Sequence, residues 1–273
     1  MKANKILFIA QEIVPFTESS AIADNCRYLL QATQERGHEI RTFMPKWGSI
    51  NERRNQLHEV IRLTGMNIVV DDTDHPLIIK VASLQALRTQ IFFILNEDYF
   101  RNHLNTRDEK GNEYPDNDER TIFFSRSVLE TVKKQSWYPD VIHCHGWIGA
   151  LTGLYIKTFY KDEPAFRNAK FVYSIYDDAF TSDFPEDYLK KILVKNMEEV
   201  DFSDINTPVN YRELTKMAIK WSDGVIQNYE NVDPELIEYA HSLGKPVLDY
   251  KTGTEYADAC SEFYNQLYSQ GIE

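Results

Sequence analysis

The sequence predicts an α/β protein built on a doubly wound, mostly parallel β-sheet. Short apolar runs alternate along the chain with longer segments whose apolar residues recur at helical spacing. The predicted strands are apolar without a break, which requires cover on both faces of the sheet. A chain of 273 residues has ample core for one large domain. Because we find no internal repeat, low-complexity tract or clear linker, we expect a single domain over residues 1–273.

The first elements are a strand, a helix and a second strand. Lys5 to Gln11 is a continuous apolar strand, and a turn leads from it into a helix over residues 21–35. Gly37 is placed to end this helix, and Glu39 to Pro45 is the second strand. The inward stripe of the helix is expected to consist of Ile22, Cys26, Leu29, Leu30 and Thr33.

The middle of the chain is predicted to leave the parallel pattern and return to it. Leu77 to Leu84 and Thr89 to Leu95 resemble an antiparallel excursion after a mixed segment, and residues 105–115 are the most loop-like. A helix over 117–135 follows, which Asp116 or Asn117 could cap. Its buried stripe is expected to consist of Ile122, Phe123, Val128, Leu129 and Val132.

The strand Val141 to His145 is the most informative element. Strand alternation places His143 and His145 on one face and Cys144 on the other. Ligands of open parallel sheets bind at the carboxyl ends of strands, where these histidines and Trp147 lie. The remaining expected helices cover residues 147–160, 185–195, 211–221, 234–243 and 256–268, and the remaining expected strands cover 170–175, 224–227 and 246–248.

Composition excludes several classes of protein. The net charge of −12 argues against nucleic acid and anionic membrane surfaces as partners. No apolar run approaches the roughly 20 residues of a membrane span. The apolar run that Glu12 closes is predicted to be a buried strand rather than a signal peptide. Three scattered cysteines without CxxC spacing favour a reduced, cytoplasmic compartment.

Two stretches carry a family resemblance. The first reads Y-P-D-N-D-E-R-T-I-F-F-S-R from Tyr114, and the second reads P-D-V-I-H-C-H-G-W from Pro139. They resemble Y-x-D-N-x-x-R-F-x-x-F-S-R and P-D-V-x-H-x-H-D-W-H of the bacterial glycogen and plant starch synthases. These are retaining glucosyltransferases that transfer glucose from ADP-glucose to an α-1,4-glucan. The resemblance implies a Rossmann-like domain corresponding to the N-terminal half of a GT-B type glycosyltransferase.

The loop after the first strand departs from the family pattern. The family has E-x-x-P followed by K-x-G-G-L-A-D, and Glu12, Pro15, Ala23 and Asp24 match it. The lysine that contacts the donor diphosphate is replaced by Glu18. The two glycines are replaced, in order, by Ser20 and Ala21. Replacing a cation by an anion beside a phosphate changes an attraction into a repulsion. The Coulomb energy of such a pair is about 1 kcal/mol in water or about 4 kcal/mol at an effective dielectric of 20. The loop is therefore predicted to be a poor phosphate cradle.

The other donor-site positions are mixed. His143, His145 and Trp147 match the family, and His145 aligns with the histidine that contacts the donor glucose near the reacting bond. Gly146 replaces the family aspartate and Ile148 the last histidine. The substrate-binding positions implied by the resemblance are Glu12, Asp24, His143, His145, Trp147 and Tyr176, where Tyr176 stands in place of a histidine.

Each of these residues also has a structural interpretation. The two histidines could be satisfied, partly buried residues at a strand end, and Trp147 could be core or cleft wall. Zinc sites need more ligands than His-Cys-His offers. We expect no metal and no cofactor.

The resemblance covers most of the chain and is weak after residue 180. It implies that the second domain of a synthase, which supplies cations for the phosphates, has no counterpart in these 273 residues. We therefore expect the isolated chain to be inactive. The open alternatives are a non-catalytic module that binds glucan, a sugar or a full synthase, and one half of a split glucosyltransferase whose second domain is a separate chain.

The cleft face is expected to be exposed. The aromatic and histidine side chains expected there belong to Phe16, His145, Trp147, Tyr176 and Phe180. An exposed patch of this kind would favour homodimerisation or a protein or glucan partner.

Overall fold

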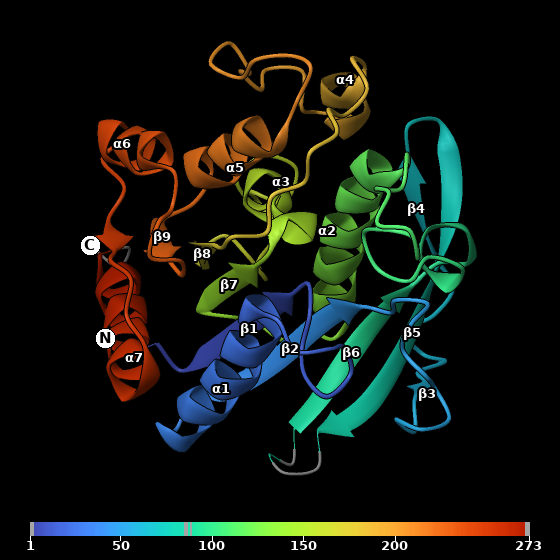
Figure 1. Cartoon of the computed structure of the whole chain (residues 1–273), viewed down its shortest axis with the longest axis horizontal. Coiled ribbons are helices and arrows are strands. Elements are labelled where there is room, and N and C mark those ends of the chain that lie inside the picture. The colour runs from blue at the N-terminus through green and yellow to red at the C-terminus, as the bar shows by residue number, and fades with distance from the viewer. Residues whose placement is uncertain (1–2, 85–86, 88, 271–273) are drawn as a thin grey trace.

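The structure is a computed structural model that describes residues 3–84, 87 and 89–270. Within these residues one twisted sheet of ten strands runs through the molecule (Figure 1), in the order β10-β9-β8-β7-β1-β2-β6-β5-β3, with β4 paired to β5. The strands are β1 Lys5–Ala10, β2 Glu39–Pro45, β3 His58–Glu59, β4 Met66–Val70, β5 Thr73–Leu84, β6 Thr89–Leu95, β7 Val141–His145, β8 Lys170–Ile175, β9 Gly224–Gln227 and β10 Val247–Leu248.

Seven of these strands are parallel, which confirms the predicted fold class. β1 pairs in parallel with β2 and β7, and the parallel ladder continues through β6 on one side and through β8, β9 and β10 on the other. β5 runs antiparallel to β6, β3 and β4. The predicted antiparallel excursion is therefore confirmed. β1 and β7 have neighbours on each side and therefore lie in the interior of the sheet.

Helices cover both faces of the sheet. They are α1 Ala21–Glu35, α2 Asn117–Lys134, α3 Thr152–Lys157, α4 Tyr188–Ile192, α5 Tyr211–Lys220, α6 Pro234–Ser242 and α7 Gly253–Ser269, with a π-type turn at Glu97–Arg101 and a 3₁₀ turn at Trp147–Gly149. α1 and α7 pack against each other on one face, while α2, α3 and α5 form a continuous layer on the other (Figure 1). Two covered faces explain why the central strands are apolar without alternation.

The helix stripes agree with the sequence pattern. Every residue expected to point inward from α1 and α2 is buried. Gly37 follows α1 with a positive φ of 83°, as expected for the residue that ends a helix. The apolar spacing therefore correctly predicted the buried faces of α1 and α2.

Two predicted helices are shorter than expected. Residues 185–195 form only α4, because Leu193 is extended and Asn196 has a positive φ of 71°. Residues 147–160 form a 3₁₀ turn followed by the short α3. The interruption lies near Gly149, where an added Cβ would be 2.7 Å from Cys144 Sγ. At Gly149 the chain lies too close to the sheet to accommodate a side chain.

The expected side-chain cap of α2 is also wrong. Asp116 occupies the N-cap position but makes no capping hydrogen bond, and one of its carboxylate oxygens lies 3.6 Å from Nε2 of His103. The Asn117 amide donates instead to the Thr106 carbonyl at 2.9 Å. These side chains fix the preceding loop rather than the first turn of the helix.

Candidate functional site

The carboxyl ends of β1, β7 and β8 lie side by side and carry the residues that sequence analysis selected. The parallel register pairs Ala10 with His145 and His145 with Ser174. The loops that follow these strands therefore begin at one edge of the sheet: residues 11–20 after β1, Gly146 onward after β7 and Tyr176 onward after β8. This edge is where an open α/β sheet binds ligands.

The loop after β1 closes the amino end of α1 with its own side chains. Ser20 is the N-cap residue, and its Oγ accepts a hydrogen bond from the Ala23 amide at 3.0 Å. The same hydroxyl donates to Glu12 Oε2 at 2.5 Å. Ser19 Oγ donates to Asp24 Oδ2 at 2.6 Å. One amide that could have met an anion at this helix end is thus already satisfied within the chain.

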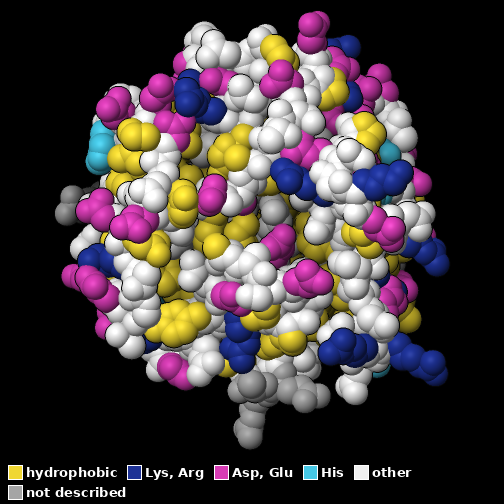
Figure 2. Space-filling model, in the orientation of Figure 1, with side chains coloured by type: hydrophobic (Ala, Val, Ile, Leu, Met, Phe, Trp, Pro, Cys, Tyr) yellow, Lys and Arg dark blue, Asp and Glu magenta, His cyan; other side chains and the backbone are white. Residues whose placement is uncertain are grey.

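Carboxylates surround this loop. Burial raises the pKa of Glu12, partly offset by its hydrogen bond from Ser20. Glu18 is exposed on the loop and lines a surface cavity of about 580 Å³ together with Glu12 and Ser20. The basic residue that lines the same cavity is Arg54. Figure 2 shows acidic and apolar side chains meeting around the hollow in the middle of the viewed face.

The two histidines lie together on one face of β7, as alternation predicted. Their ring centroids are 3.8 Å apart and both side chains are fully buried. His143 Nδ1 lies 2.7 Å from the Tyr264 hydroxyl of α7, and its Nε2 lies 2.6 Å from Ser174 Oγ. Both ring nitrogens of His143 are therefore engaged within the protein.

His145 is equally enclosed. Its Nδ1 lies 2.8 Å from the Tyr176 hydroxyl, and its ring stacks on Phe8 at 5.9 Å between centroids. Burial lowers the pKa of His145 to about 3, so the ring is neutral at ordinary pH. Its Nε2 is buried and has no hydrogen-bond partner among the described residues. In this conformation the imidazole has no surface from which to contact a sugar.

The expected exposed aromatic face is wrong. The five side chains named for it, those of Phe16, His145, Trp147, Tyr176 and Phe180, are each at most 7% exposed. Trp147 packs on Phe180 with centroids 4.9 Å apart, and Phe180 stacks on Phe184 at 4.6 Å. The aromatic residues after β7 and β8 cover one another and thereby remove the apolar patch from the surface.

Gly146 links β7 to the following turn where no side chain fits. Its φ is +90°, and an added Cβ would lie 2.6 Å from the Gln11 Cβ. Ile148, the next of the altered positions, is fully buried. The two amides that open the turn are satisfied by side chains: Trp147 N donates to Asp178 Oδ2 at 3.3 Å, and Ile148 N donates to Gln11 Oε1 at 3.1 Å.

A second cavity of about 330 Å³ lies between these loops. Its polar lining is dominated by Glu12, Asp177 and Asp178, and its one lining cation is Arg107. Arg107 donates to Glu113 Oε1 at 2.9 Å, so its charge is already compensated. Burial raises the pKa of Asp178 to about 6, although the Tyr211 hydroxyl donates to this carboxylate at 2.7 Å. The cavity is acidic and disfavours an anionic ligand.

Sequence reasoning missed Gln11, Arg107 and the supporting role of Asp178. Gln11 directly follows the first strand and Asp178 lies just after β8, so their positions at strand carboxyl ends were a usable signal. Arg107 lies in the segment that was classified only as a loop. Among the described residues no group of His, Cys, Asp and Glu could hold a metal ion. No helix in the part that the structure describes is long and apolar enough to span a membrane.

Comparison with known proteins agrees with this architecture. A family model described as the starch synthase catalytic domain matches residues 5–245. Glycogen synthase of Chlorobium luteolum is 38% identical over 190 residues, which cover 69% of this chain and 39% of that protein. Glycogen synthase of Chlorobium limicola is 39% identical over 174 residues, covering 63% of this chain and 36% of that one. The matched segments thus cover less than half the length of these relatives.

A solved structure gives the same fold. It is the catalytic domain of starch synthase IV from Arabidopsis thaliana bound to ADP and acarbose. It superposes with a TM-score of 0.69 at 19% identity, covering 93% of this chain and 52% of that one. At this identity the match establishes the architecture of half a GT-B glycosyltransferase.

Proposed function

The chain belongs to the starch synthase catalytic domain family, and we propose that it is a glycogen synthase-like protein whose own donor loop does not bind ADP-glucose. One observation carries this proposal. The amino end of α1, where a donor diphosphate would be cradled, is capped by Ser20, whose hydroxyl is in turn held by Glu12. Glu18 adds a further carboxylate to the loop.

The energetics oppose an anion at this position. A diphosphate would have to displace Ser20 from the Ala23 amide, at a cost of about 1 kcal/mol for a lost N-cap. It would also approach Glu18 and Glu12. Each close pair of like charges costs about 1 kcal/mol in water and about 4 kcal/mol at an effective dielectric of 20. Several kcal/mol correspond to an affinity lowered by several hundredfold or more.

The proposed role is therefore non-catalytic binding within glucan metabolism, with a glucan or a complete synthase as the partner. The parts of the family pattern that build the scaffold are retained: the buried strands β1 and β7 and the apolar stripes of α1 and α2. Several polar positions are replaced, His143 and His145 are enclosed within the protein, and the retained Glu12 and Asp24 accept hydrogen bonds from Ser20 and Ser19.

The donor loop is tested by calorimetric titration with ADP-glucose. We expect no binding to the wild type at about 1 mM ligand, roughly the weak limit of functional binding. The triple variant Glu18→Lys, Ser20→Gly, Ala21→Gly should bind at least tenfold more tightly, because it removes the cap and restores the cation. Glu35→Lys is the matched control, since it makes the same charge change at the exposed far end of α1.

Micromolar affinity of the wild type for ADP-glucose would overturn the proposal. Glucose transfer to glycogen by the wild type alone would also do so. Co-sedimentation with glycogen and co-purification with a full synthase separate the two proposed partners. Activity that appears only after adding a second chain would favour the split-enzyme alternative.

A further inference from the structure

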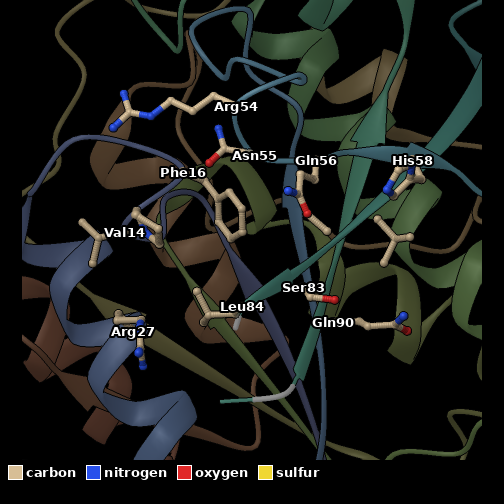
Figure 3. A pocket seen from close by; sticks show the side chains of 13 residues that line it. Val14, Phe16, Arg27, Arg54, Asn55, Gln56, His58, Ser83, Leu84 and Gln90 are labelled. Carbon is tan, nitrogen blue, oxygen red and sulfur yellow. The ribbon is translucent and has the colours of Figure 1, made fainter. Parts of the chain in front are cut away.

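The largest of the described cavities lies outside the acidic edge, on the other side of the turn at Val14–Phe16. It has a volume of about 610 Å³, within the usual range for small-molecule sites. Its walls come from this turn, from α1, from the segment between β2 and β3, and from the adjoining ends of β5 and β6 (Figure 3). Its lining residues are Val14, Pro15, Phe16, Arg27, Arg54, Asn55, Gln56, His58, Val81, Ala82, Ser83, Leu84 and Gln90.

The charge of this cavity is opposite to that of the protein. Arg27, Arg54 and His58 line it, and no aspartate or glutamate of the described residues does, although the chain carries a net charge of −12. Neither arginine forms an ion pair with a carboxylate of the described residues; Arg27 Nη1 donates only to Gln31 Oε1, at 3.3 Å. By contrast, Arg107 and Arg212 are each paired with carboxylates. The two guanidinium groups are thus available to an external anion.

Neutral polar groups lie between the charged ones. Asn55, Gln56, Ser83 and Gln90 present amides and a hydroxyl, and Ser83 and Gln90 are directly paired across β5 and β6. Such groups both donate and accept, which matches the hydroxyls of a polyol. The amides of Asn55 and Gln56 lie beside the Phe16 ring in Figure 3.

The cavity also has an apolar part and a charged rim. Phe16 is fixed edge-on against Phe93 with centroids 5.0 Å apart, and Val14 and Leu84 adjoin it. In Figure 3 the guanidinium ends of Arg27 and Arg54 extend outward on opposite sides of this apolar part. Arginine side chains have several rotatable bonds, so a bound anion would draw either guanidinium group inward by a change of rotamer.

We propose that this cavity binds a small phosphorylated polyol, of the size of a sugar monophosphate. Guanidinium groups form short, charge-assisted and often bidentate hydrogen bonds with phosphate oxygens. The side-chain amides and the Ser83 hydroxyl form hydrogen bonds with the hydroxyl groups of the polyol. Phe16 and Leu84 contact its carbon skeleton. The site shares Val14, Pro15 and Phe16 with the loop after β1 but not the amino end of α1, and it does not depend on the function proposed above. Pro15, Phe16 and Arg54 also line the cavity beside Glu18, so a ligand here would contact the reverse side of the donor loop.

The test is calorimetry with glucose 1-phosphate as the probe, alongside inorganic phosphate and free glucose. We expect glucose 1-phosphate to bind at least tenfold more tightly than either fragment. Arg54→Gln and Arg27→Gln should each weaken this binding by about tenfold or more, because each removes a charged hydrogen-bond donor. Arg53→Gln is the matched control: Arg53 is the exposed neighbour of Arg54 but does not line the cavity.

Three results would overturn the assignment. The first is no binding of glucose 1-phosphate up to about 10 mM, beyond which binding is too weak to be specific. The second is binding of free glucose or of inorganic phosphate as tight as that of glucose 1-phosphate. Either result would show that one part of the ligand, the phosphate or the polyol, is not recognised. The third is an equal loss in Arg53→Gln and Arg54→Gln, which would indicate non-specific attraction to surface charge. Unchanged urea midpoints for all variants ensure that a loss reflects the site rather than folding.

Discussion

His145 belongs to the family binding motif, but its imidazole here contacts only other residues of the protein. The resemblance places it where a synthase contacts donor glucose, but here Nδ1 is engaged by Tyr176 and the ring is enclosed by Phe8 and His143. Strand alternation was enough to predict that the two histidines lie together. Alternation could not predict that the two rings are buried. His143 Nδ1 contacts the hydroxyl of Tyr264, which lies 121 residues further along the chain.

The buried state of His145 makes stability depend on pH. Its pKa of about 3 in the folded protein lies below the ordinary histidine value of about 6.5, so between these values the unfolded chain binds more protons. Stability contributed by the neutral ring is therefore lost as pH falls, by about 1.4 kcal/mol per pH unit. We expect the free energy of unfolding of the wild type, measured in urea, to fall relative to that of His145→Gln by about this amount per pH unit from about pH 6 to pH 4.

The comparison with His145→Gln removes groups that do not interact with His145; the exception is His143, whose pKa is lowered mainly by burial and in part by His145. Asp178, with a pKa raised to about 6, acts with the opposite sign, because the folded state holds its proton more tightly and stability falls as pH rises towards 6. This contribution is present in both proteins and cancels in their difference. At about pH 8, above the window, the two curves should run parallel. Parallel curves throughout the acid range would contradict the assignment of a neutral, buried His145.

At the scale of elements, the junction between β7 and its following turn explains one departure from the family pattern. Gly146 has a positive φ and faces Gln11, whose side chain caps the turn at Ile148. An aspartate at position 146, as the family has, would displace that cap. Sequence comparison identified the substitution, whereas its physical reason required the contact between two loops that are far apart in the chain.

Two glycine substitutions separate backbone strain from steric clash at this junction. Gly146 and Gly65 both have φ of +90°, but an added Cβ meets Gln11 at 2.6 Å in the first case and nothing within 4 Å in the second. Both Gly→Ala changes should cost about 1–3 kcal/mol for the positive-φ backbone. Gly146→Ala should cost about 1–3 kcal/mol more from overpacking. Equal losses in urea denaturation would show that Gln11 moves aside freely.

The buried strands and the long helices were predicted well, and the short helices were not. α1 and the strands β2, β7, β8 and β9 match their predicted bounds, because burial on one stripe or on both faces dictates the pattern. The segment 185–195 has good helix formers, yet tertiary packing ends its helix at Ile192, which is fully buried. Propensity is a weak guide when a helix is only a turn or two long.

At the scale of the whole molecule, the continuous sheet argues for one cooperative unit. Strands from both ends of the chain join the same ladder, with β1 at its centre and β10 at one edge. The terminal helix α7 packs on α1, and the Ala3 amide donates to Asn265 Oδ1 at 2.9 Å. No segment of the described residues has a core of its own to unfold around, so we expect residues 1–273 to behave as a single domain.

Unfolding should therefore occur in one transition, whichever part of the molecule is observed. Tryptophan fluorescence, from residues 47, 137, 147 and 221, and far-UV circular dichroism should give the same urea midpoint. Leu267→Ala in α7, at a buried position, should lower the stability by about 2–5 kcal/mol and shift both midpoints together. Leu243→Ala is the matched control, because Leu243 is 40% exposed and its truncation should lower the stability much less.

An early fluorescence or dichroism step in Leu267→Ala, with the remaining signal unfolding at the wild-type midpoint, would mean that the last helix and the strands beside it form a separate unit. The sheet would then be continuous in geometry but not in stability, because the ladder between β8 and β9 would be too weak to couple its two sides.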